Sequence, residues 1–305
     1  MESAELLCNE KILPSWNDSS PTRAAPDPAL QRDSRVLERL LSLETKHVTG
    51  RRRLLSSQVE IDAGMRKIVA RWMSEVCDER CCEDVVFPLA MNYLDRFLSV
   101  VTIRKSQLQL VGAVCLLIAS KLRQSLPFTS ELLVYYTDYS VGVDEIRAWE
   151  LLILTTLKWD VAPVVATDFV DHLLIRLPVD KNRATVRRHA NTFIALCSID
   201  DQFASYPPSL IATASVAAAA DGLEGIHKPW SDLDELLSLL QQITGIEATS
   251  VGCVVRRIER AVRSEMAAAL ESDPTPPDGG GKTCGKEVAE RPETPVETHL
   301  RGASF

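Results

Sequence analysis

The middle of the chain shows the periodicity of α-helices almost without interruption. Apolar residues recur at helical spacing from Met65 to Val76 and from Val86 to Leu98, and each stretch predicts an amphipathic helix with one buried stripe. The segment from Leu108 to Leu122 is apolar on almost every side, which is typical of a helix surrounded by others. Since no stretch shows strand-like alternation, the pattern predicts an all-α protein.

The same pattern recurs one hundred residues later along the chain. The apolar run from Leu110 to Ala119 has a counterpart from Leu210 to Ala219, and the stripe of 86–98 has one that starts at Val186. Shorter helical patterns lie around the two central runs, at 132–136, 146–157, 168–177, 231–243 and 249–270. The repeat predicts two tandem domains of about five helices, each around one buried helix, joined near 158–167.

The two ends differ in composition from the middle. Residues 1–33 contain several prolines among polar residues, which predicts an irregular, extended segment. A helical pattern around 36–43 adds one helix ahead of the first domain, so this domain with its extra helix spans 34–160 and the second domain spans 161–270. Residues 271–305 hold five prolines and five glycines and cannot bury enough apolar surface to offset their chain entropy, so we expect a disordered tail.

Charge and hydropathy narrow the range of partners. The net charge of −8 and the pI near 5.3 argue against generic binding to nucleic acid or to an anionic membrane, so any basic site must be local. No apolar stretch approaches the ~18 residues that a membrane span needs. The start of the chain carries Glu2 and Glu5 where a secretory signal would carry basic residues. We therefore expect a soluble protein with no direct nucleic-acid or membrane contact.

Residues able to bind a metal or to catalyse a reaction are scattered. The group Cys77, Cys81 and Cys82 lacks a second cysteine pair or a histidine partner, so we interpret these residues as core or helix-end cysteines. Asp200 and Asp201 lack the third carboxylate of a helical metal-dependent enzyme, and they fit a solvated turn. Without a phosphate-binding loop or a catalytic signature, the sequence predicts no enzyme activity, no metal and no cofactor.

Four motifs carry a resemblance to a known family. They are Met65–Met73 (MRKIVARWM), Phe87–Leu98 (FPLAMNYLDRFL), Leu108–Lys121 (LQLVGAVCLLIASK) and Leu157–Trp159 (LKW). In this order they closely resemble the cyclin box, and in particular that of the D-type cyclins. The resemblance extends over roughly 35–263 and includes Tyr206-Pro-Pro-Ser209 in the second repeat. It implies two tandem five-helix cyclin-like domains, in agreement with the repeat.

The resemblance implies the function of a regulatory subunit. Cyclins bind and allosterically activate a cyclin-dependent serine/threonine kinase, and the lysine and glutamate at these motif positions, here Lys121 and Glu150, grip the kinase. Both residues also have an ordinary structural explanation, as a lysine that closes an apolar helix and a glutamate on a helix surface. The implied partner is a kinase of the kind used by D-type cyclins, and its activity would promote progression into S phase.

The resemblance also implies a docking patch for Arg-x-Leu peptides of inhibitors and substrates. The matching residues are Met65, Ile68, Trp72, Glu75, Leu108 and Gln109. In cyclins the tryptophan forms the floor of a shallow apolar patch, and the acid lies near the arginine of the peptide. For Ile68 a place in the core is an equal alternative, because an apolar stripe normally faces inward.

A short motif near the start of the chain points to a second class of partner. Leu6, Cys8 and Glu10 form the pattern Leu-x-Cys-x-Glu, and in an extended peptide their side chains all point one way. D-type cyclins carry such a motif at this place, where it binds retinoblastoma-family pocket proteins, the substrates to be phosphorylated. The resemblance therefore implies that this segment tethers the substrate and raises its effective concentration.

The tail contains Thr-Pro pairs that a kinase can modify. Thr294 and Thr275 offer the same chemistry, and the resemblance favours Thr294, whose phosphorylation would lead to nuclear export and recognition by a ubiquitin ligase. The chain would accordingly occur in both nucleus and cytoplasm. Val296 and Glu297 stand where the family usually continues with Thr-Asp, which weakens the comparison at this signal.

Two hypotheses from other classes fit the sequence less well. A general transcription factor with paired cyclin-like folds would show basic faces on both repeats and often a zinc ribbon, and the acidic pI and the absence of paired Cys-x-x-Cys motifs argue against it. A helical metal-dependent enzyme would need a full carboxylate set, which the sequence lacks.

The chain departs from the family at two further places. Arg51, Arg52 and Arg53 form an added basic loop without an assigned role. Arg123-Gln124 replaces the usual Lys-Glu beside the kinase surface.

Overall fold

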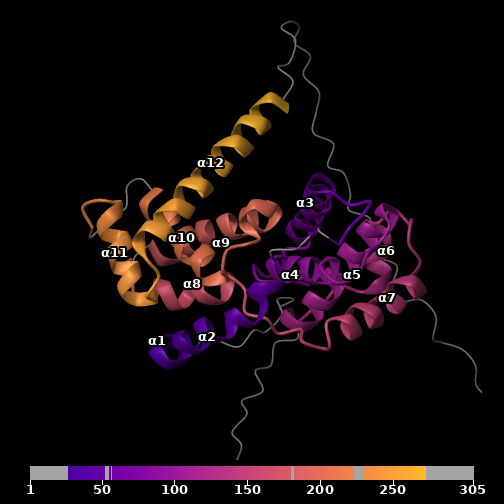
Figure 1. Ribbon diagram of the computed structural model, residues 1–305, viewed down its shortest axis with the longest axis horizontal. Helices are drawn as coiled ribbons and strands as arrows, with labels where there is room; N and C mark the ends of the chain where they lie inside the picture. Colours follow the sequence, from indigo (N-terminus) through magenta and orange to yellow (C-terminus); the bar gives the residue numbers. More distant parts are fainter. Residues whose placement is uncertain (1–26, 52–54, 56, 180–181, 223–229, 273–305) are drawn as a thin grey trace, which may run out of the picture.

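The computed structural model describes residues 27–51, 55, 57–179, 182–222 and 230–272, and over these residues the chain is all-α. Two helices come first, α1 (Pro28–Arg32) and α2 (Ser34–Arg51). The first domain comprises α3 (Ala63–Glu79), α4 (Val86–Leu98), η1 (Lys105–Gln107), α5 (Leu108–Arg123), α6 (Ser130–Tyr136) and α7 (Val143–Thr156). The second comprises α8 (Thr167–Leu174), α9 (Arg183–Ile199), η3 (Asp201–Phe203), α10 (Pro208–Gly222), α11 (Leu233–Thr244) and α12 (Ala248–Ser272). Figure 1 shows the two domains side by side, which confirms the predicted fold class.

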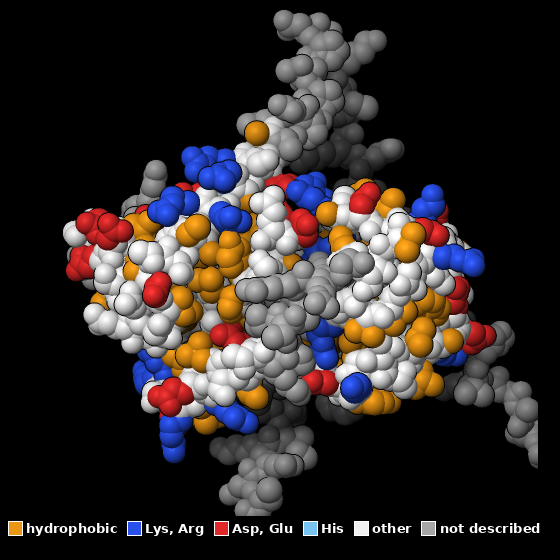
Figure 2. Space-filling view, in the orientation of Figure 1, with side chains coloured by type: hydrophobic (Ala, Val, Ile, Leu, Met, Phe, Trp, Pro, Cys, Tyr) orange, Lys and Arg blue, Asp and Glu red, His pale blue; other side chains and the backbone are white. Residues whose placement is uncertain are grey.

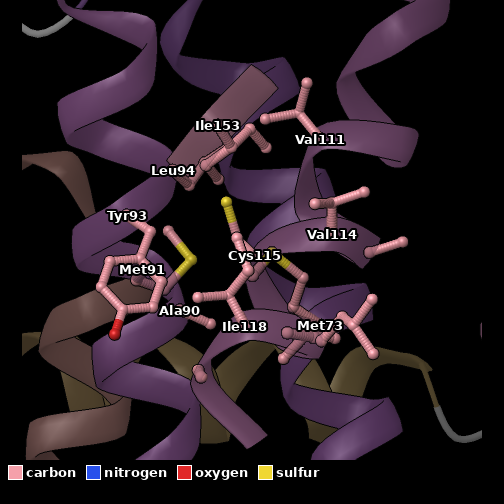
Figure 3. Close-up of a cluster of buried hydrophobic side chains, with 14 of the residues drawn as sticks. Met73, Ala90, Met91, Tyr93, Leu94, Val111, Val114, Cys115, Ile118 and Ile153 are labelled. Carbon is pink, nitrogen blue, oxygen red and sulfur yellow. The ribbon is translucent and has the colours of Figure 1, made fainter. Parts of the chain in front are cut away.

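The first domain is built around α5. Every residue from Leu110 to Ser120 is buried, because α3, α4 and α7 pack around this helix. Figure 3 shows Cys115 of α5 facing Leu94 of α4 in the core. At Gly112 a Cβ atom would lie only 3.1 Å from the sulfur of Met73, so glycine permits the close approach of α3 to α5. This close approach fixes the surface where α3 and the start of α5 meet.

The second domain repeats the plan around α10. Residues 211–220 are all buried, and α8, α9, α11 and α12 pack against this helix. The inward face of α9 includes Val186, Ala190 and Ile194, which the sequence predicts to be the counterparts of the stripe on α4. Alanine dominates α10, whereas α5 carries more leucine and valine, so the neighbours of α10 can approach its backbone more closely.

The helix α1 is a correction to the sequence expectation. Residues 1–33 were expected to be irregular, but Pro28–Arg32 form one helical turn and a half. Asp27 caps this helix, its carboxylate accepting from Ala29 N at 2.8 Å, and Pro28 occupies the first turn, where its missing N–H costs nothing. Proline therefore starts a helix here instead of preventing one.

The helix α2, the predicted extra helix, contacts the second domain as well as the first. Leu37 belongs to the core of the second domain. Glu44 is buried, and its carboxylate accepts from the backbone N–H of Ser209 at 2.8 Å and from the Ser209 hydroxyl at 2.7 Å. Because Ser209 lies in the first turn of α10, this carboxylate caps the central helix of the second domain.

Polar contacts join the two domains directly. Asn191 of α9 donates to the carboxylate of Asp84, just ahead of α4, at 2.6 Å. Arg71 of α3 donates to both carboxylate oxygens of Glu265 of α12, at 2.6 and 2.8 Å. Figure 1 shows α12 as a long helix that rises from the second domain and extends past the level of α3. The C-terminal half of α12 is thus tied to the first domain by charge.

Candidate functional site

Lys121 and Glu150, which the sequence predicts to bind a kinase, meet on one surface of the first domain. Lys121 lies in the last turn of α5 and Glu150 in the middle of α7, and these two helices pack against each other. The ammonium group of Lys121 donates to Oε1 of Glu150 at 2.6 Å and to Oε2 at 2.9 Å. The structure therefore brings together two residues that lie 29 positions apart in the chain.

This ion pair is open to solvent. The side chain of Lys121 is 48% exposed and that of Glu150 is 18% exposed. Exposed ion pairs contribute only about 0–1 kcal/mol to stability, because water screens them and ordering two long side chains costs entropy. An ammonium group carries three N–H donors, so the pair keeps hydrogen-bonding capacity for a partner. We therefore expect this contact to contribute little to the stability of the fold.

Three exposed leucines are neighbours of the pair in sequence. Leu122 follows Lys121, Leu151 and Leu152 follow Glu150, and all three side chains are exposed. The helix α7 buries only two of its residues, Ile146 and Ile153, so much of its apolar surface faces solvent. We call Lys121, Leu122, Glu150, Leu151 and Leu152 the clamp surface. Apolar area around a charged pair is the arrangement that an interface core requires when a partner excludes the water.

A groove lies where α3 meets the start of α5. It has a volume of about 410 Å³ and is lined by Met65, Ile68, Val69, Trp72, Lys105, Leu108 and Gln109. Five of the six residues that the sequence predicts for a docking patch are among them. Glu75 is not, although it is exposed on α3 three positions beyond Trp72, on the same side of the helix.

Ile68 corrects the expectation of one buried stripe on α3. Val69 and Met73 are buried in the core of the first domain, whereas the side chain of Ile68 is 70% exposed and lines the groove. The apolar residues of α3 thus divide between two faces, one packed on α5 and one open. The choice between core and surface that the sequence left for Ile68 is decided in favour of the surface.

Lys105 is a groove residue that sequence reasoning missed. It begins η1, three positions ahead of Leu108, and its backbone N–H donates to the carboxylate of Glu60 at 3.1 Å. The spacing to Leu108 was the available signal, since residues three apart lie on one face of a helical segment. Lys105 gives the groove a basic end in addition to the acid on α3.

A buried ion pair behind the groove was also missed. Arg66 of α3 donates to both carboxylate oxygens of Asp95 on α4, at 2.7 and 2.8 Å. Its remaining N–H groups donate to the carbonyls of Ile199 at 2.9 Å and Ser198 at 3.2 Å, at the end of α9. One guanidinium therefore connects α3, α4 and the second domain, and it holds the helix that carries the groove.

The other candidate groups form no metal site among the described residues. Among the described residues, no group of three or more His, Cys, Asp or Glu side chains could hold a metal ion. Asp200 caps η3, its carboxylate accepting from Gln202 N at 2.9 Å, and Asp201 is exposed beside it, so both belong to the turn that the sequence predicts. Over the same part of the chain, no helix is long and apolar enough to span a membrane.

The distribution of basic residues bears on the nucleic-acid alternative. On the face shown in Figure 2, Lys and Arg side chains gather along α12, while the first domain mixes hydrophobic and charged side chains of both signs. The exposed arginines of α12 are Arg256, Arg257, Arg260 and Arg263. This face therefore lacks the basic surface across both repeats that the alternative needs.

Several predicted residues lie outside the described part of the chain. These are Leu6, Cys8 and Glu10 of the N-terminal motif, Thr294 of the tail, and Arg52 and Arg53 of the basic loop. The expectation of a disordered tail at 271–305 likewise falls almost wholly outside it. The roles assigned to the N-terminal motif and to Thr294 stay predictions.

Comparison with known proteins agrees with the geometry. The family description "Cyclin, N-terminal domain" matches residues 35–162, and "Cyclin, C-terminal domain" matches residues 164–272. The G1/S-specific cyclin-D3 of Bos taurus is 45% identical over 294 residues, covering 96% of this chain and 98% of that protein. The G1/S-specific cyclin-D2 of Gallus gallus is 48% identical over 273 residues, covering 88% of each.

Solved structures give the same result. A viral cyclin from herpesvirus saimiri superimposes with a TM-score of 0.66 at 29% identity, covering 75% of this chain and 96% of that one. The likeness extends over both helical domains, and the sequence matches cover nearly the whole chain at well above 30% identity. The chain therefore belongs to the cyclin family and, within it, to the D-type cyclins.

Proposed function

We propose that this chain binds and allosterically activates a cyclin-dependent serine/threonine kinase at the G1/S stage of the cell cycle, with the clamp surface as the main contact. Cyclins are non-catalytic regulatory subunits of kinases, so the phosphoryl chemistry belongs to the partner. The observation that carries the proposal is the exposed ion pair of Lys121 and Glu150 beside exposed leucines. The relatives named G1/S-specific cyclins support the stage of the cycle.

The clamp surface suits an inserted helix of the kinase. The Lys121 ammonium donates to carbonyl groups of the partner, and the Glu150 carboxylate accepts from its N–H groups. Leu122, Leu151 and Leu152 bury their apolar area against the same helix. Excluding water strengthens the charged contacts, so the pair matters far more in the complex than in the free chain.

Activation follows from selective binding. A protein kinase needs the glutamate of its αC helix paired with a lysine of the β-sheet before it holds ATP productively. If the clamp surface binds only the conformation in which that helix faces inward, binding shifts the kinase toward its active state. Moving such an equilibrium from 1:99 to 99:1 requires about 5.5 kcal/mol of differential affinity, which a large interface can supply.

The groove on α3 and α5 is proposed as the docking site for Arg-x-Leu peptides of inhibitors and substrates. Its apolar lining, above all Ile68 and Trp72, accommodates the leucine side chain. Glu75, exposed one turn beyond Trp72, lies where it can attract the arginine. The groove and the clamp surface use different residues of α5, near opposite ends of that helix, so both can be occupied at once.

The remaining roles are proposed on sequence alone. Leu6, Cys8 and Glu10 recruit retinoblastoma-family pocket proteins for phosphorylation and so promote progression into S phase. Phosphorylation of Thr294 in the tail leads to ubiquitin-dependent degradation, and the chain acts in nucleus and cytoplasm. The D-type membership of the chain supports these roles.

Reconstitution tests the proposal. The full chain is mixed with candidate cyclin-dependent kinases, and phosphorylation of a pocket-protein fragment is measured. Wild type raises the kinase activity, Lys121→Ala fails to do so, and Cys8→Gly keeps the activation but phosphorylates the pocket protein less efficiently. Arg71→Ala, which removes an exposed cation of α3 that pairs with Glu265 of α12, serves as the matched control and activates like wild type. Full activation by Lys121→Ala would contradict the proposed contact.

A further inference from the structure

The end of α3 brings two cysteines together through its backbone. Cys81 adopts the left-handed conformation with φ of 49°, and its N–H donates to the carbonyl of Asp78 at 3.1 Å. The N–H of Cys82 donates to the carbonyl of Cys77 at 2.9 Å. These are the two hydrogen bonds of a Schellman motif, which places the residue after the left-handed position against the third residue from the helix end. Here both of those residues are cysteines.

The backbone hydrogen bond makes the two cysteines of this motif neighbours, but they differ in exposure. Cys77 is buried in the core of the first domain, whereas Cys82 is partly exposed. A backbone hydrogen bond directly between two residues leaves their Cα atoms at a separation of the order that a disulfide spans, about 4.4–6.8 Å. Both cysteines are free thiols in the structure.

Cys82 opens onto a cavity. The cavity has a volume of about 260 Å³ and lies between the end of α3 and the chain that follows α5. Its lining includes Arg80, Cys82 and Gln124. A peroxide molecule is much smaller than this space. A small oxidant can therefore reach the sulfur of Cys82, while Cys77 behind it stays shielded.

The surroundings favour the thiolate form of Cys82. The hydrogen bond from the Cys77 thiol lowers the pKa of Cys82 most, and the Gln124 amide and the Arg80 guanidinium lower it further, against the effect of burial. The contact with Cys82, together with burial, raises the pKa of Cys77. The Gln124 amide can donate to a thiolate, whereas a carboxylate at this position would repel it.

We propose that Cys82 is an oxidation site that reacts with hydrogen peroxide and is resolved by Cys77 to form a disulfide. The Cys82 thiolate attacks one oxygen of the peroxide, the O–O bond breaks, and a sulfenic acid and hydroxide form, the hydroxide then taking a proton to become water. The Cys77 sulfur then attacks the Cys82 sulfur, the S–O bond breaks, and the second water leaves with the Cys77 proton. The two thiols lose two electrons in total, and the peroxide gains them.

Tryptic peptides of the full chain distinguish this disulfide from other pairings. Cleavage after Arg71, Arg80 and Arg96 separates Trp72–Arg80, which holds Cys77, from Cys81–Arg96. After peroxide treatment the two peptides are expected to be joined by a disulfide, which mass spectrometry detects. A disulfide between the neighbours Cys81 and Cys82 would leave the peptides separate. In Cys82→Ser the disulfide-joined peptide pair is expected to be absent. In Cys81→Ser, the matched control, the joined pair is expected to form as in wild type.

Two further variants test the chemistry. In Cys77→Ser, dimedone is expected to trap a sulfenic acid on Cys82, because the resolving thiol is gone. In Gln124→Glu, the reaction of Cys82 with peroxide slows by about three- to tenfold, because a carboxylate disfavours the thiolate. In wild type Cys82 reacts about tenfold faster than Cys253, a lone exposed cysteine on α12. Equal oxidation of Cys82 and Cys253, or a joined pair that survives Cys82→Ser, would overturn the proposal.

Discussion

The first domain contains two ion pairs of nearly equal length and opposite character. Arg66 and Asp95 lie 2.7 Å apart with side chains 2% and 7% exposed. Lys121 and Glu150 lie 2.6 Å apart with side chains 48% and 18% exposed. The guanidinium of the buried pair also donates to two carbonyls of the second domain, whereas the ammonium of the exposed pair donates to the two carboxylate oxygens of Glu150.

The comparison shows that the burial of an ion pair decides whether it stabilises the fold or is available to bind a partner. The charges of Arg66 and Asp95 are buried away from water, and each is compensated by the other. Removing one residue therefore leaves an uncompensated buried charge on its partner. The charges of Lys121 and Glu150 remain hydrated, and little stability depends on them. A buried pair therefore holds the fold, and an exposed pair beside apolar surface is available for a partner. Each prediction below would break or sharpen this contrast.

The largest expected effect is on the buried pair. Arg66→Ala leaves the Asp95 carboxylate buried without its cation, and we expect a loss of about 3–5 kcal/mol in the free energy of unfolding. Urea denaturation followed by circular dichroism measures it. Asp95→Ala, which strands the guanidinium, should give a loss of the same order. If Arg66→Ala lowered the free energy of unfolding by less than about 1 kcal/mol, the buried pair would contribute no more to stability than an exposed pair does, which would contradict the contrast.

A third ion pair, Arg123 and Asp168, has side chains 33% and 19% exposed. We expect it to have a smaller, pH-dependent effect on the free energy of unfolding. Asp168 lies 3.4 Å from Arg123 across the domains, and burial raises the pKa of its carboxyl despite the cation. The folded state then binds a proton more readily than the unfolded state. The contribution of this group to the free energy of unfolding therefore falls as pH rises from the unfolded pKa near 3.8 through the raised folded value.

Asp168→Asn removes this dependence of the unfolding free energy on pH. Relative to wild type, the variant should gain stability as pH rises through this window and lose the gain as pH falls. Urea denaturation at a series of pH values measures the difference. The opposite slope would show that attraction to Arg123 outweighs burial at this carboxyl.

The smallest expected effect on stability is at the exposed pair. Lys121→Ala should change the free energy of unfolding by no more than about 1 kcal/mol, since the charges are hydrated before and after the change. The same denaturation assay measures it, with Arg71→Ala as an exposed control whose partner is Glu265. A loss as large as that of Arg66→Ala would remove the contrast between the pairs.

The sequence predicts well the helices that are defined by the local periodicity of apolar residues. The apolar runs at α5 and α10 define the two central helices, because a helix that is apolar on every side must be surrounded. The family resemblance assigned Lys121 and Glu150, since neither a helix-ending lysine nor a surface glutamate is distinctive by itself.

The parts that the sequence did not predict depend on contacts between distant residues. Arg66 looks like any charged position on an amphipathic helix until Asp95, 29 residues later, folds against it. Ile68 follows the period of the buried stripe, but none of the described helices covers it, and it is exposed. At α1 a local signal existed, since Asp27 followed by Pro28 is a capping residue and a first-turn proline.

The most direct test of the account is the affinity of a cyclin-dependent kinase for Lys121→Glu, measured by titration calorimetry alongside wild type and Arg71→Glu. Charge reversal places two carboxylates together in a desolvated contact, so we expect the dissociation constant to rise by the equivalent of about 2–5 kcal/mol, or roughly 30- to 5,000-fold. Arg71→Glu should bind like wild type, and the unfolding free energy of Lys121→Glu should stay within about 1 kcal/mol of wild type. Unchanged kinase affinity in a folded Lys121→Glu protein would contradict the central claim that the exposed pair is the kinase contact.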